Sequence, residues 1–175
     1  SKGFIITNAN CTTTGLAHMI KPLLDNEDTS NILTASMSTI HAVTNTQSVL
    51  DSVPKAGEKD LRKNRSILDS IILTSTNAAK ALAEVIPEVQ HIGFMADSIR
   101  IPTSTMSLIV LNATFQARVN KQDGQMAINT KMINELYRKA AENNPEKLIR
   151  FTMEQNVPAD LIGVDAAVII EGQFN

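Results

Sequence analysis

The stretch GFIITNANCTTTGLAHMI (residues 3–20) contains the only cysteine of the chain, between two predicted elements. Residues 3–7 are a short apolar, β-branched run that ends at the polar NAN, which predicts a buried strand followed by a turn. From Thr12 onward, apolar residues recur every three or four positions, and this spacing predicts an amphipathic helix that ends near Asp25. Cys11 therefore lies at the N-terminus of the predicted helix.

Length, composition and charge limit the classes of protein to which the chain can belong. Its 175 residues, 43% of them hydrophobic, suffice for one globular domain with a substantial core. The net charge of -2 provides no basic field that would attract nucleic acid or anionic lipid. One cysteine cannot form an internal disulfide, and no apolar run is long enough to cross a membrane. We expect a soluble, cytoplasmic protein, and the apolar run so close to Ser1 suggests a chain cut from a longer one.

The middle of the chain predicts a strand, a long loop and a helix. Residues 31–43 are rich in β-branched side chains and predict a strand that carries His41 near its far end. Residues 44–66 form a polar segment longer than ordinary connections, and long loops in compact domains tend to be functional. Residues 78–89 predict a helix closed by Pro87.

The second half of the chain supplies further strands and one more helix. Residues 91–116 predict a pair of long strands, with Arg100 late in the first. An amphipathic helix is predicted at residues 129–144, and two short strands follow it. Because strands adjoin one another while helices are set apart, we predict an α+β fold rather than a doubly wound sheet. The sequence has no Gly-rich phosphate fingerprint, which excludes a dinucleotide-binding domain.

Cys11 is a candidate nucleophile. Free backbone N–H groups at a helix N-terminus stabilise a thiolate, and a histidine within hydrogen-bond reach would complete the activation. His18 lies about two turns along the same helix and is too far away, and His91 follows a helix stop. His41, at the end of a strand, is the best candidate. An unreactive turn cysteine and a structural histidine remain the alternative.

Other residues suggest anion binding. The threonines at positions 12–14 can cap the helix or donate hydroxyl groups to an anion at its N-terminus, and the two roles are compatible. Arg100 lies between two isoleucines, so if it is buried it needs an anionic partner, either a bound phosphate or carboxylate or a structural ion pair. No spacing of cysteine and histidine fits a metal site.

Four segments, in the same order, resemble motifs of glyceraldehyde-3-phosphate dehydrogenase. NANCTTTGLA resembles the catalytic-cysteine motif, STIHAVTNTQ the histidine motif, KDLRKNRSILDSIILTSTNAAKAL the loop and phosphate-site helix, and SIRIPTSTMS the arginine strand. TMEQNVPADLIG is similar to the closing segment, more loosely. The resemblance covers the catalytic half of that family. It implies that residues 1–175 are a single catalytic domain, without the NAD-binding domain and the closing helix, and that a mixed, largely antiparallel sheet has helices packed on one face.

The resemblance also implies a mechanism and its residues. In that family a cysteine attacks the aldehyde to form a thiohemiacetal, hydride leaves to NAD, and inorganic phosphate releases the resulting thioester as an acyl phosphate. Cys11 would be this nucleophile, and His41 would hold the thiolate, act as base and donate to the oxyanion. Thr44 and Arg100 would bind the substrate's phosphate. The attacking phosphate would be bound by Thr12, Thr76, Asn77 and a base of the long loop, which is Lys63 by resemblance, with Arg62 and Arg65 as alternatives.

The chain departs from the family's pattern at several positions. Asn10 stands where a serine usually precedes the cysteine, Asn77 where a glycine is usual, and Val110 where an aspartate is common. The loop at residues 51–59 is also longer than usual. These departures suggest a divergent branch with altered anion geometry.

A cofactor and partners follow from the same resemblance. It implies NAD or NADP, bound mainly by the missing domain, a phosphorylated aldehyde and inorganic phosphate as reactants, and a glycolytic or gluconeogenic role. It implies a homotetramer in which the long loop is an interface element. The alternatives are a related phosphorylated-aldehyde or semialdehyde dehydrogenase, and a non-catalytic interaction module that keeps the fold. The separate chain is expected to lack dehydrogenase activity.

Overall fold

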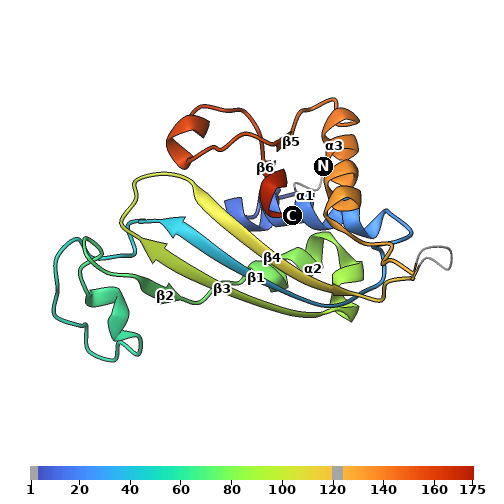
Figure 1. The fold of residues 1–175 in the computed structure, drawn as a ribbon. Coiled ribbons are helices and arrows are strands. Elements are labelled where there is room, and N and C mark those ends of the chain that lie inside the picture. Colours follow the sequence, from blue (N-terminus) through green and yellow to red (C-terminus); the bar gives the residue numbers. More distant parts are fainter. Residues whose placement is uncertain (1–3, 120–123) are drawn as a thin grey trace.

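A computed structural model of the chain describes residues 4–119 and 124–175 (Figure 1). The predicted helix after Asn10 and the predicted strand that carries His41 are both present. In chain order, the helices and strands of the described residues are α1 (Cys11–Leu24), β1 (Ile32–Ala42), β2 (Ile72–Thr74), α2 (Ala78–Val85), β3 (Gly93–Ile101), β4 (Ser107–Phe115), α3 (Thr130–Glu142), β5 (Ile149–Thr152) and β6 (Val168–Glu171). Short 3-10 turns cover Leu61–Asn64, Pro87–His91, Pro158–Leu161 and Gly172–Phe174.

The main sheet has four strands in the order β2-β3-β1-β4. Strand β1 is parallel to β3 and antiparallel to β4, and β2 is antiparallel to β3. This arrangement confirms the predicted α+β fold with a mixed, largely antiparallel sheet. The two long strands that follow one another in the sequence, β3 and β4, are not neighbours, because β1 lies between them and pairs with both (Figure 1).

The helices cover one face of this sheet. Residues Ala35, Met37 and Thr39 alternate along β1 and are buried. Met37 belongs to a core cluster with side chains of α1 and α2, and Ala35 to a second cluster that includes α3. On β4 the alternate positions Leu108 and Val110 are exposed, because no helix of the described residues covers the opposite face. The period of two along the strands therefore separates a buried face from an open one.

Helix α3 closes one end of the core against α1. Tyr137 is buried, and its hydroxyl donates a hydrogen bond to the carbonyl of Met19 at 2.8 Å. The core cluster that contains Tyr137 also includes Leu23 of α1, Ile149 of β5 and Ile170 of β6. Strands β5 and β6 form a separate parallel pair. The two short strands predicted at the end of the chain thus extend the core rather than the main sheet.

The strand predicted at residues 3–7 is wrong for the part of it that the structure describes, and Gly3 lies outside the described residues. Phe4, Ile5 and Ile6 are exposed and belong to no strand. A strand needs a neighbour to satisfy its backbone N–H and C=O groups, and no described strand pairs with these residues. The apolar pattern indicates a segment that favours burial, but it does not show that a sheet edge lies beside it.

Candidate active site

Asn10 starts the helix that carries Cys11. Its side-chain Oδ1 accepts a hydrogen bond from the backbone N–H of Thr13 at 2.9 Å, and its carbonyl accepts from that of Thr14 at 2.9 Å. Ala9 has a φ of 52°, in the left-handed region, and turns the chain sharply before the cap. Cys11 therefore occupies the first position of α1, as predicted. The alternative in which a threonine at positions 12–14 caps the helix is wrong, because Asn10 does so.

Cys11 and His41 face each other where α1 begins and β1 ends. The distance from Cys11 Sγ to His41 Nε2 is 3.5 Å, which allows a hydrogen bond between thiol and imidazole. Cys11 is exposed and His41 is half-buried, so the sulfur is open to a small molecule while the sheet holds the imidazole. His18 instead contacts the carbonyl of Thr14 through its Nδ1 at 2.8 Å. The structure therefore brings His41, and not His18, to the thiol.

Arg100 lies beside His41, because the two residues are paired in the register of the parallel strands β1 and β3. Its Nη1 lies 2.5 Å from His41 Nδ1 and 3.0 Å from the carbonyl oxygen of Ala42. His41 Nδ1 is itself 2.8 Å from that oxygen. Among the described residues, Arg100 takes part in no ion pair, and its buried Nε has no hydrogen-bond partner. The alternative of a structural ion pair is therefore not found there.

Thr44 lies in a tight turn just after β1. Its backbone N–H and its hydroxyl both donate to Oε1 of Gln47, each at 3.0 Å. Gln47 is buried, and its own N–H donates to the Thr44 carbonyl at 3.1 Å. Gln47 therefore positions Thr44, a role that the sequence analysis missed. The available signal was the polar TNTQ directly after a strand, since such a segment closes on itself through side-chain hydrogen bonds.

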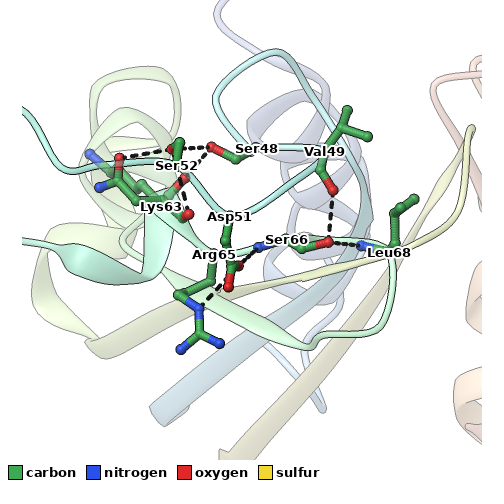
Figure 2. A network of polar contacts seen from close by, with 9 residues as sticks. Ser48, Val49, Asp51, Ser52, Lys63, Arg65, Ser66 and Leu68 are labelled. Atoms are coloured by element: carbon green, nitrogen blue, oxygen red, sulfur yellow. Dashed lines mark hydrogen bonds and ion pairs between the residues drawn. The ribbon is translucent and has the colours of Figure 1, made fainter.

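The long loop after β1 is closed by hydrogen bonds between its two arms (Figure 2). Asp51 Oδ1 accepts from the backbone N–H of Ser66 at 2.7 Å and from Nε of Arg65 at 3.1 Å. The hydroxyl of Ser48 donates to the carbonyl of Lys63 at 3.1 Å. The Ser66 amide first, and the Arg65 side chain second, hold the pKa of Asp51 below its usual 3.8. Hydrogen bonds between its own polar groups therefore hold the two arms of the loop together.

Two of the three basic side chains considered as phosphate ligands in this loop form ion pairs with carboxylates. Arg62 pairs with Asp60 at 2.7 Å, and Arg65 pairs with Asp51 at 3.1 Å. The hydrogen bond from Arg62 is the main reason that the pKa of Asp60 is lowered, and the charge of Lys63 contributes as well. Lys63 belongs to no ion pair of the described ranges. This favours Lys63 over its neighbours as an anion ligand, and the assignment stays a prediction.

The remaining predicted anion ligands lie at the first turns of two helices. Thr12 is buried in α1. At the start of α2, Thr76 Oγ1 accepts from the N–H of Ala78 at 3.2 Å, and Asn77 makes no side-chain cap bond. In the part of the chain that the structure describes, no hydrogen bond joins Thr76 or Asn77 to the Cys11–His41 pair. Their assignment to a phosphate site stays a prediction.

The sequence contains no Gly-rich phosphate-binding turn. The seven glycines are too far apart in the sequence to build the Gly-rich turn that holds a pyrophosphate.

Across residues 4–119 and 124–175, no three potential metal ligands gather. No helix in those ranges is long and apolar enough to cross a membrane. A groove between α1 and α3, lined by residues such as His18 and Leu136, does not include Cys11 or His41.

The chain is similar to known proteins over almost its whole length. A family model described as glyceraldehyde 3-phosphate dehydrogenase, C-terminal domain, matches residues 10–175. A glyceraldehyde-3-phosphate dehydrogenase 2 from Trichormus variabilis is 34% identical over 170 residues, which are 97% of this chain and 45% of that protein. A glyceraldehyde-3-phosphate dehydrogenase from Chlamydia pneumoniae is also 34% identical, over 97% of this chain and 46% of that protein. The one from Amanita muscaria is 34% identical over 95% of this chain and 52% of its own length. The chain thus spans about half the length of these relatives.

Proposed function

Because the chain belongs to the glyceraldehyde-3-phosphate dehydrogenase family, as its C-terminal domain, we propose that it carries the catalytic half of a phosphorylating aldehyde dehydrogenase. The observation that carries the proposal is the 3.5 Å between Cys11 Sγ and His41 Nε2 at the N-terminus of α1. The reaction is the oxidation of glyceraldehyde 3-phosphate to an acyl phosphate, in glycolysis or gluconeogenesis.

Cys11 and His41 have successive roles in this reaction. The sulfur attacks the aldehyde carbon, a C–S bond forms, and the carbonyl oxygen takes up the electron pair while His41 Nε2–H donates to it. NAD or NADP, held by parts of the protein outside this chain, would take two electrons and one hydrogen as hydride. The thioester left on Cys11 is attacked by inorganic phosphate, the C–S bond breaks, and the thiolate is restored as the acyl phosphate leaves.

The anionic groups of both reactants need separate ligands. Arg100 contacts His41 near the end of β3, and Thr44 follows the end of β1, and we assign both to the phosphate of the substrate. The attacking phosphate is assigned to the two helix N-termini and the loop base, that is to Thr12, Thr76, Asn77 and Lys63. The positive ends of helix dipoles and a lysine ammonium group both favour a phosphate oxygen.

The assembled protein is proposed to be a homotetramer in the cytoplasm. A free, exposed thiol suits a reducing compartment, in which it stays available for catalysis. The open face of the main sheet and the long loop after β1 supply surfaces for contacts between subunits. Exposed apolar side chains on that loop, Val49, Leu50 and Val53, support its role as an interface element.

Two reactions measured on one sample test the proposal. The separate chain is mixed with a nitrophenyl ester, which can acylate a thiol, and with glyceraldehyde 3-phosphate, phosphate and NAD. We expect slow acylation of Cys11 and no detectable NADH, because hydride transfer needs a nicotinamide held against the reacting carbon. The remainder of the full-length protein should restore NADH formation.

The control separates thiol chemistry from other esterase activity. Cys11→Ser should abolish acylation, and His41→Ala should slow it strongly, by roughly 10²-fold or more if His41 acts as the general base. Failure of intact Cys11 to acylate would contradict the catalytic assignment. NADH produced by the pure separate chain, dependent on Cys11, would instead contradict the division of the site between two parts of the protein.

A further inference from the structure

The contact between Arg100 and His41 restricts the position of the imidazole proton. A guanidinium nitrogen only donates hydrogen bonds, so Arg100 Nη1 at 2.5 Å requires a lone pair on His41 Nδ1. With Nδ1 unprotonated, the proton of a neutral imidazole sits on Nε2, which faces Cys11 Sγ. In this arrangement His41 can donate to a thiolate or an oxyanion, but it cannot accept the proton of the thiol.

A second hydrogen-bond partner competes for the same nitrogen. The carbonyl oxygen of Ala42 lies 2.8 Å from His41 Nδ1, and a carbonyl oxygen only accepts. Nδ1 can therefore either accept from Arg100 or donate to Ala42, but it cannot do both. When it donates to Ala42, Nε2 is free to accept a proton, and His41 can become an imidazolium.

Arg100 is only partly satisfied where it stands. It donates to His41 and to the Ala42 carbonyl, while its buried Nε finds no hydrogen-bond partner among the described residues. A guanidinium group forms its strongest hydrogen bonds with carboxylate or phosphate oxygens, often two at once. An oxyanion arriving beside the strand ends would therefore compete well for this side chain.

We propose that Arg100 couples anion binding to the activation of Cys11, by releasing His41 Nδ1 when it turns to a phosphate oxygen. The inference rests on the proposed function, in which Arg100 meets the phosphate of the substrate. Without an anion, Arg100 holds His41 in the form that donates from Nε2. With an anion, Nδ1–H donates to Ala42 and Nε2 becomes available to the thiol.

The proton balance of this step is simple. The Nε2 proton of the resting imidazole moves through solvent to Nδ1, and the thiol proton then passes to Nε2. The neutral thiol and imidazole become a thiolate and an imidazolium, with no net gain or loss of protons. The titratable or charged groups that face His41 are the thiol of Cys11 from α1 and the guanidinium of Arg100 from β3, while β4 presents Ser107 as its register partner. The substrate would thus prepare the nucleophile that attacks it.

The test measures alkylation of Cys11 in the full-length protein without its cofactor. Iodoacetamide is used because it is uncharged, and the modified Cys11 peptide is followed by mass spectrometry. Inorganic phosphate is added against chloride at equal ionic strength. We expect phosphate to raise the alkylation rate about fivefold or more, the usual scale of coupling between two binding events. Phosphate should also move the pH profile of alkylation to lower pH.

Two variants separate this coupling from general electrostatics. Arg100→Gln should lose the response of both the rate and the pH profile to phosphate. Arg150→Gln removes the same charge at an exposed position on β5 and should keep the response. A response that persists in Arg100→Gln overturns the inference.

The outcome also separates the inference from the proposed function. Phosphate binding is measured by calorimetry on the same proteins. If binding depends on Arg100 while alkylation ignores phosphate, the coupling is wrong and the proposed function stands. If phosphate does not bind at all, the coupling is again wrong. The acylation of Cys11 by an ester then tests the proposed function independently.

Discussion

The side chain of Asn10 stabilises the first turn of α1 and, with it, the position of Cys11. Asn10→Ala removes the acceptor for the Thr13 N–H and leaves that donor without its cap. We expect the free energy of unfolding to fall by about 1 kcal/mol, the usual cost of losing such a cap. Urea denaturation followed by circular dichroism measures the change.

Asn10→Ser is the matched control for this prediction. A serine hydroxyl also accepts a hydrogen bond from the helix N-terminus, so this variant should keep most of the stability that alanine loses. Equal losses in the two variants would show that the cap hydrogen bond is not the reason.

At the scale of single residues, the sequence predicted one side-chain contact of the site and missed another. Cys11 and His41 could be paired because each lies at the end of a strongly patterned element, the first at a helix start and the second at a strand end. The contact of His41 with Arg100 could not be predicted, because it depends on the register between two parallel strands. No local pattern encodes that register, which is set when both strands pack beneath the helices.

At the scale of elements, Tyr137 joins α3 to α1. Burial raises the pKa of its hydroxyl above the usual 10.0. The folded chain therefore keeps the phenol proton at a pH at which the unfolded chain releases it, so the stability is complete below pH 10 and declines above it. The decline attributable to this group approaches about 1.4 kcal/mol per pH unit. Tyr137→Phe should lack this part of the slope, and urea denaturation at pH 9, 10 and 11 compares the two proteins.

The composition of the chain makes this prediction easy to check. Tyr137 is the only tyrosine, and there is no tryptophan, so the ultraviolet absorbance of phenolate reports on one residue. The folded protein should show no phenolate near pH 10, while the urea-unfolded protein should show half. Below pH 9, Tyr137→Phe should lose only about 0.5–1.5 kcal/mol, for the hydrogen bond to Met19. Phenolate appearing in the folded protein near pH 10 would contradict the burial argument.

Most elements were predictable, because their period of apolar residues is clear, but the neighbours of each strand were not. Strands β3 and β4 are adjacent in the sequence, and a hairpin would be the simplest arrangement. The structure places β1 between them, which gives β1 two partners and lets Met37 pack against both α1 and α2. Residues 4–7 show the opposite failure, since their pattern suits a strand but the described residues provide no edge for it.

At the scale of the whole molecule, the open face of the main sheet exposes several large apolar side chains. The exposed side chains on it include Leu73, Met95, Leu108 and Val110. In the middle of this face, Val110 and Asp97 flank Ser38 across the register. These exposed apolar side chains support the proposed assembly of subunits, since exposed apolar surface is typical of contact sites between proteins.

Leu108→Asp tests whether this face holds subunits together, because Leu108 is exposed on it. The change would bury a carboxylate in the interface, where an unpaired charge is costly. We expect the dissociation constant of the full-length assembly to rise about tenfold or more, as measured by analytical ultracentrifugation.

Val85→Asp provides the comparison for this change. Val85 is exposed at the end of α2, on the covered side of the sheet, and a new carboxylate there should leave the assembly intact. An assembly that resists Leu108→Asp would place the subunit contacts elsewhere on the molecule.

The parallel pairing of β1 with β3 also determines when the site is completed as the chain folds. Parallel strands need a long crossover, here through β2 and α2, so we expect the strand that carries Arg100 to join late. The contact of Arg100 with His41 spans 59 positions, whereas the cap that Asn10 provides spans three. The start of α1, which positions Cys11, can therefore form before Arg100 reaches His41. In a refolding chain, the moment at which Cys11 begins to respond to phosphate would mark the docking of β3.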